Sequence, residues 1–156
     1  MNARLNVAAD PVAMKAWKHI IAASKALGES TLPAATRELV MLRASQINGC
    51  AACIDMHTKE AFAAGEEAVR LHLVVAWREA TVFTDAERAA LELTEEATRI
   101  ADAAGGVSDE VWANAAKHYD EAQLAALITQ IAVINAFNRA NVIVQQPAGG
   151  YVPGQH

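Results

Sequence analysis

The chain has 156 residues, of which 53% are hydrophobic and 20% are charged, and its formal net charge is −5 at pH 7. This length predicts one domain, residues 1–156, with a substantial core, and an acidic chain without a basic run argues against a nucleic-acid partner. No apolar run reaches the length of a membrane span, and the N-terminal residues show no signal-peptide pattern. We therefore expect a cytoplasmic protein that does not bind a membrane.

The composition favours helices over strands. Alanine is abundant and aromatic residues make up only 5% of the chain, which suits helices better than sheets. Capping residues and glycine or proline breakers divide the sequence into an all-α succession of about seven helices. We predict these helices at residues 10–28, 33–47, 50–65, 66–79, 84–104, 108–119 and 120–144. A flexible Pro/Gly-rich tail from about 146 to 156 is expected to fray or to lie across a neighbouring element.

Apolar residues at helical spacing indicate which faces are buried. The last predicted helix is apolar on two sides, so we expect it to be central or to form an interface. It also carries a polar patch of Asn135, Asn138 and Arg139, for which we favour a structural role over a place at a reactive site. The residues predicted to face the core include Trp17, Ile20 and Ile21; Leu71, Val74 and Val75; Leu93 and Ile100; Val111, Trp112 and Tyr119; and Leu124, Leu127, Ile128 and Ile131.

The strongest chemical signal is a C-x-x-C pair formed by the two cysteines of the chain, Cys50 and Cys53. A thiol reacts as its thiolate, and C-x-x-C motifs, helix N-termini and nearby histidines all favour that form. Asn48 and Gly49 predict a turn into a new helix, which places Cys53 in its first turn, where the macrodipole favours an anion. His57 lies four residues after Cys53 and therefore shares its helix face.

Other interpretations of the cysteine pair compete with a reactive site. Buried cysteines often act as small hydrophobes. A structural zinc site needs a fourth ligand beyond Cys50, Cys53 and His57, and the chain has no further cysteine, so we expect no metal. Covalent haem requires a histidine directly after the second cysteine, and that residue is Ile54. A thioredoxin-type site requires a strand before the motif, and none is predicted.

The spacing from Glu38 through Cys50 and Cys53 to His57 resembles the E-x11-C-x2-C-x3-H signature of the AhpD-like alkylhydroperoxidases, in the carboxymuconolactone decarboxylase superfamily. The flanking ASQINGCAACIDMHTKEA, WREA at 77–80 and INAFNR at 134–139 resemble the family as well, so the likeness covers about residues 33–144. The residue before the second cysteine is Ala52, where relatives often carry a histidine or an aromatic residue. The resemblance implies an AhpD-like all-α fold, assembly as trimers or hexamers, and no cofactor.

The resemblance also implies the roles of the four motif residues. Cys53 attacks the peroxide and becomes a sulfenic acid, and Cys50 condenses with it to form a disulfide. Glu38 and His57 relay the proton, and an external dithiol or a protein reductant reopens the disulfide. The expected function is thus thiol-dependent peroxide reduction. A lyase of the decarboxylase type, as in cysteine-free members of the superfamily, and a non-enzymatic redox sensor remain as alternatives.

Overall fold

The computed structural model describes residues 2–154, so the last two residues of the predicted tail lie outside the described part of the chain. Residues 2–154 form seven α-helices and three short 3-10 helices, and no strand occurs among them. The prediction of an all-α fold is confirmed. The elements are η1 (Val7–Ala9), α1 (Pro11–Ala26), η2 (Leu27–Glu29), α2 (Ala34–Asn48), α3 (Ala51–Ala63), α4 (Ala68–Leu73), η3 (Val74–Ala76), α5 (Asp85–Thr98), α6 (Asp109–His118) and α7 (Glu121–Val144).

Helix starts follow from capping residues that are visible in the sequence. The Asp10 carboxylate accepts a hydrogen bond from the Ala13 N–H at 2.7 Å, and Pro11 occupies the first helical position of α1. Thr84 and Asp120 each form a complete capping box, at α5 and α7. These side chains satisfy N–H groups that have no partner within the helix, which is why the boundaries were predictable.

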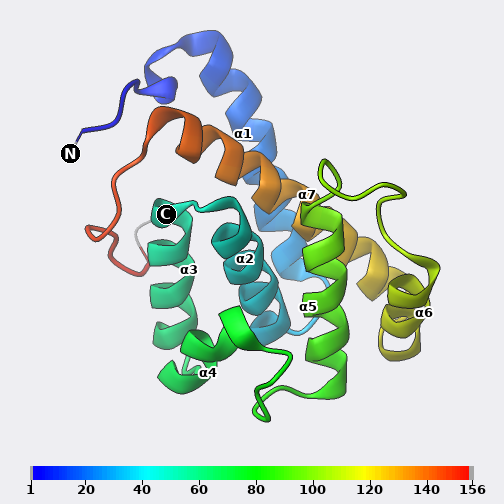
Figure 1. Cartoon of the computed structure of the whole chain (residues 1–156). Coiled ribbons are helices and arrows are strands. Elements are labelled where there is room, and N and C mark those ends of the chain that lie inside the picture. The colour runs from blue at the N-terminus through cyan, green and yellow to red at the C-terminus, as the bar shows by residue number, and fades with distance from the viewer. Residues whose placement is uncertain (1, 155–156) are drawn as a thin grey trace.

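The central helix of the fold is α2. Figure 1 shows α2 between α3 and α5, and α7 also packs against α2. Eight residues of α2 are buried: Thr36, Leu39, Val40, Met41, Leu42, Arg43, Ala44 and Ser45. A helix buried on several sides cannot shift without disturbing the whole core, so α2 holds the residues it carries in fixed positions.

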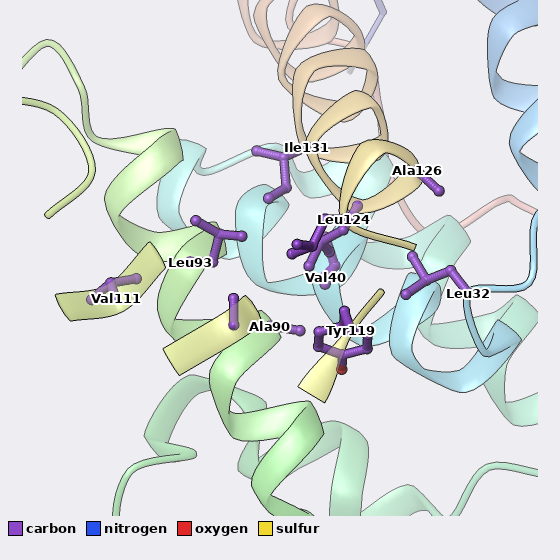
Figure 2. Packing of buried hydrophobic residues seen from close by; sticks show 11 residues of the cluster. Leu32, Val40, Ala90, Leu93, Val111, Tyr119, Leu124, Ala126 and Ile131 are labelled. Atoms are coloured by element: carbon purple, nitrogen blue, oxygen red, sulfur yellow. The ribbon is translucent and has the colours of Figure 1, made fainter. Parts of the chain in front are cut away.

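Two clusters of apolar side chains pack against α2 from different sides. Figure 2 shows the first, in which Val40 of α2 lies close to Leu124 of α7, while Ala90 and Tyr119 come from α5 and the end of α6. The second joins α2 to α3, α4, η3 and α5 and contains Leu39, Leu42, Ala61, Leu71, Val74, Trp77, Phe83 and Leu91. Trp77 is thus a core residue, 4% exposed.

A buried carboxylate ties α2, the η3 segment and α5 together. Glu95 accepts hydrogen bonds from Arg43 Nε at 2.7 Å and from Trp77 Nε1 at 2.9 Å, and it also forms an ion pair with Arg78. Burial pushes the pKa of Glu95 upward, but the hydrogen bonds from Arg78, Trp77 and Arg43 outweigh it and hold that pKa below its ordinary value. Glu95 therefore stays ionised and fixes α2 against α5.

Several sequence predictions about the edges of the fold are wrong. The predicted helix at 66–79 is only Ala68–Leu73, followed by η3, whose three-residue period turns Val75 outward to 60% exposure. The fifth helix ends at Thr98, and the following residues form turns that leave Ile100 exposed. Three further residues predicted to be buried, Ile21, Trp112 and Ile128, are exposed. The spacing of apolar residues shows which face of a helix is turned to the core. The width of the buried part of that face depends on how much of it the neighbouring helices cover.

The 24-residue helix α7 is long and apolar enough to pass a length-and-composition test for a membrane span, contrary to the expectation from the sequence that no apolar run would do so. The core helix of a globular fold passes the same test. Leu124, Leu127, Ile131 and Ile134 of α7 are buried in the interior, so core packing accounts for the apolar residues on that side of the helix.

The tail lies across α3 up to residue 154. The Asp55 carboxylate accepts a hydrogen bond from the Gly149 N–H at 2.7 Å, and Lys59 Nζ donates to the carbonyls of Gly149 and Tyr151. The Tyr151 hydroxyl donates to Glu60, and burial together with that carboxylate raises the pKa of Tyr151. Asp55, Lys59 and Glu60 of α3 are therefore half-buried and bind the tail.

Candidate active site

The connection between α2 and α3 brings the cysteine pair into position. Gly49 ends α2 with φ = 66°, a left-handed conformation that glycine adopts without steric cost. The Cys50 N–H donates to the Ser45 carbonyl at 3.0 Å, and α3 begins one residue later. Cys50 is the N-cap of α3, and its sulfur accepts a hydrogen bond from the Cys53 N–H at 3.3 Å. The predicted turn and the position of Cys53 in the first turn of α3 are both observed.

Cys50 and Cys53 form a disulfide within this first turn. Their Cα atoms are 5.3 Å apart, and the two residues are 1% and 2% exposed. The bond closes a loop of only three residues in sequence separation. Oxidation and reduction of this pair can therefore proceed with local movement of the α3 N-terminus.

A second pair, Glu38 of α2 and His57 of α3, lies one turn further along α3. His57 Nδ1 is 3.0 Å from Glu38 Oε2. An ionised carboxylate only accepts hydrogen bonds, so Nδ1 carries the proton and donates it, and Nε2 is left to receive or release a proton. His57 is 6% exposed, and its Nε2 has no hydrogen-bond partner among residues 2–154.

The structure thus brings together the four residues expected from the sequence as two contacting pairs. Cys50 contacts Cys53, Glu38 contacts His57, and α3 joins the pairs because Cys53 and His57 are one turn apart on the same helix face.

Asn141 of α7 is a site residue that the sequence interpretation missed. Its Nδ2 donates a hydrogen bond to Cys53 Sγ at 3.3 Å. The available signal was its spacing, since Asn141 follows Asn138 by three residues and so lies on the same side of α7. Asn141 is the α7 residue that contacts the sulfur.

Two residues of the predicted polar patch on α7, Asn135 and Asn138, make structural hydrogen bonds. Asn48 Nδ2 at the end of α2 donates to Asn135 Oδ1 and to Asn138 Oδ1, both at 2.9 Å, and Asn138 Nδ2 donates to Ser45 Oγ at 3.0 Å. These bonds hold the end of α2, just before the cysteine turn, against α7. Asn135 and Asn138 thus help to position the turn that carries the cysteines.

Within residues 2–154, no group of three or more histidine, cysteine, aspartate or glutamate side chains is placed to hold a metal ion. The expectation that the site binds no metal still rests on the sequence, which offers no fourth ligand beside Cys50, Cys53 and His57.

Comparisons with known proteins agree with the geometry. The model of the carboxymuconolactone decarboxylase family matches residues 11–96. The uncharacterised protein YdfG of Bacillus subtilis (strain 168) is 39% identical over 131 residues, which cover 84% of this chain and 88% of that protein.

Two solved structures with different degrees of sequence identity share the fold. A protein of unknown function from Agrobacterium tumefaciens, provisionally named as the antioxidant defence protein AhpD, superimposes with a TM-score of 0.88 at 32% identity, covering 96% of this chain and all of that one. The debrominase Bmp8 superimposes with a TM-score of 0.75 at 17% identity, covering 85% of this chain and 70% of that one. At that low identity the second likeness concerns the fold alone.

Proposed function

This chain belongs to the carboxymuconolactone decarboxylase family and has the AhpD-like fold, and from that premise we propose that it is a thiol-dependent peroxidase. The observation that carries the proposal is the Cys50–Cys53 disulfide at the α3 N-terminus, one turn from a histidine that is hydrogen-bonded to a carboxylate. A dithiol that closes into a disulfide beside a proton acceptor is equipped for two-electron reduction of a peroxide.

The reaction proceeds in two chemical steps. His57 takes the proton of the Cys53 thiol, and the thiolate attacks the terminal oxygen of the hydroperoxide, breaking the O–O bond. Cys53 becomes a sulfenic acid, and the departing alkoxide takes up the proton from His57 and leaves as an alcohol. The Cys50 thiol then attacks the Cys53 sulfur, which releases water and forms the disulfide.

The cycle requires a reductant from outside the chain. A dithiol, either small or carried by a partner protein, donates two electrons and two protons and so returns Cys50 and Cys53 to thiols. Such exchange fits the reducing cytosol, where we propose that the protein works.

We also propose that the protein is a homo-oligomer, a trimer or a hexamer. No residue of α1 is fully buried in the single chain, and large hydrophobic side chains of α1 and of the end of α7, such as Val12 and Ile143, are exposed. Apolar surface of this kind is typical of an interface. Light scattering after gel filtration is expected to give three or six times the chain mass, and a monomer at micromolar concentration would contradict this proposal.

The experiment that tests the function starts from fully reduced protein. Addition of one equivalent of tert-butyl hydroperoxide is expected to convert both thiols into one intrachain disulfide, with loss of two hydrogens by mass spectrometry. With excess dithiol, turnover should follow, and alcohol should accumulate in proportion to peroxide consumed. Two thiols that persist, or cross-chain disulfides alone, would exclude the mechanism. A disulfide that forms without turnover by any reductant would instead favour a redox sensor.

A further inference from the structure

A cavity of about 240 Å³ lies beside His57, between the C-terminal part of α1 and helices α2, α3 and α7. Its wall includes His57 and Glu38, the proposed proton relay, and Gln130 from α7. It is smaller than a typical site for a drug-sized ligand, but much larger than one water molecule. The cavity is therefore of a size for a small organic molecule.

Two buried polar atoms on this wall have no hydrogen-bond partner among residues 2–154: His57 Nε2 and Gln130 Nε2. The two residues are 6% and 3% exposed. Buried polar groups are nearly always hydrogen-bonded, because an unsatisfied one loses its bonds to water without replacement. Two such atoms on the wall of the same cavity indicate that a polar ligand provides their hydrogen-bond partners.

The chemistry of the two atoms defines the ligand. Because His57 Nδ1–H donates to Glu38, the Nε2 of the neutral ring presents a lone pair and accepts a proton. Gln130 Nε2 is an amide N–H donor. The matching group is one whose oxygen accepts a hydrogen bond while its O–H donates one, as in a hydroperoxide or the alcohol formed from it.

Building on the proposed peroxidase function, we propose that this cavity binds the hydroperoxy group of the substrate and that Gln130 is a substrate-binding residue. Gln130 Nε2–H donates to the peroxide oxygen that leaves as alkoxide, and His57, one turn from Cys53, faces the same group. When the O–O bond breaks, negative charge develops on that oxygen. A donor already in place stabilises the charge without reorganisation, and the proton that neutralises it comes from His57, so Gln130 is unchanged by the reaction.

Binding is tested on the oxidised protein, whose disulfide cannot reduce a peroxide. Tert-butyl hydroperoxide and tert-butanol are titrated separately while the side-chain amide of Gln130 and the imidazole of His57 are followed by ¹⁵N NMR. Both signals are expected to shift with saturation in the wild type. In Gln130→Leu the apparent dissociation constant obtained from the His57 signal should rise at least tenfold. Thr129→Val, a change at an exposed neighbour on α7, should leave the dissociation constant at the wild-type value.

Rate measurements on reduced protein provide the second arm. Gln130→Leu is expected to lower the second-order rate constant for peroxide by about 100-fold, as loss of an oxyanion donor does in other enzymes. Alkylation of Cys53 by iodoacetamide should keep its rate and pH profile, because Gln130 acts on the substrate and not on the thiol. Gln130→Glu, which keeps the shape and replaces the donor by an acceptor, repeats the test if the leucine variant folds poorly.

The outcomes separate the two proposals. Wild-type rates in the Gln130 variants, with unchanged titrations, overturn the role of Gln130 and leave the peroxidase intact. If the wild-type protein reduces no peroxide, the proposed function is refuted. The titration of the oxidised form then shows whether the cavity binds the hydroperoxide or the alcohol. Absence of both binding and reduction in the wild type overturns both.

Discussion

Replacement of Cys53 by serine is expected to abolish peroxide reduction altogether. A serine hydroxyl occupies the place of the sulfur and can still accept the hydrogen bond from Asn141, so the fold should be kept. The hydroxyl is not ionised near neutral pH and does not attack a peroxide, whereas a thiolate does. The measurement is the consumption of tert-butyl hydroperoxide under excess dithiol, with thermal unfolding as the check on folding.

The matched variant Cys50→Ser is expected to give a different result. Cys53 can still attack, so one equivalent of peroxide should be consumed, but no second thiol is present to form the disulfide. The protein should then stop as sulfenic acid on Cys53, detectable by mass spectrometry after trapping with dimedone.

The two variants also decide which sulfur attacks first. Each sulfur accepts one hydrogen bond, Cys50 from the Cys53 N–H and Cys53 from Asn141, so hydrogen bonding alone does not distinguish them. The proximity of His57 favours Cys53. If Cys50→Ser abolishes the first turnover while Cys53→Ser allows one, the roles are reversed.

The cysteine turn was predictable because its determinants are local. Gly49 supplies the left-handed residue that ends α2, and the C-x-x-C spacing brings the two sulfurs within one turn of α3. The distance between Glu38 and His57 was not predictable from local rules. It depends on the packing of α2 against α3, and only the resemblance in spacing connected the two residues.

Residues on α7 show where sequence reasoning ends. Asn141 and Gln130 lie far in sequence from the motif; the spacing of Asn141 from Asn138 indicates its side of α7, but no local pattern says what that side faces. Asn141 contacts Cys53, and Gln130 lines the cavity beside His57, because α7 packs along α2 and also contacts α3. Such positions follow from helix crossing, which periodicity does not encode.

Loss of the proton relay is expected to slow the reaction without removing either thiol. In Glu38→Gln the carboxylate that holds the His57 Nδ1 proton is replaced by a neutral amide, and in His57→Asn the proton acceptor itself is absent. General acid–base groups contribute on the order of a hundredfold or more to rate, so both variants should lose about that factor in peroxide reduction near pH 7. His72→Asn and Glu79→Gln change the same residue types at exposed positions and should keep wild-type rates.

The pH dependence of Cys53 alkylation shows whether the loss comes from the relay. In the proposed mechanism His57 takes the thiol proton of the wild type, so we expect Cys53 to be alkylated at lower pH than an unassisted cysteine. In Glu38→Gln and His57→Asn the alkylation profile should move to higher pH, and the rate at high pH, where the thiol ionises without help, should return to the wild-type value. If both variants alkylate with the wild-type profile, the proposed relay from the thiol is wrong, since a base that does not alter thiolate formation is not the acceptor of the thiol proton.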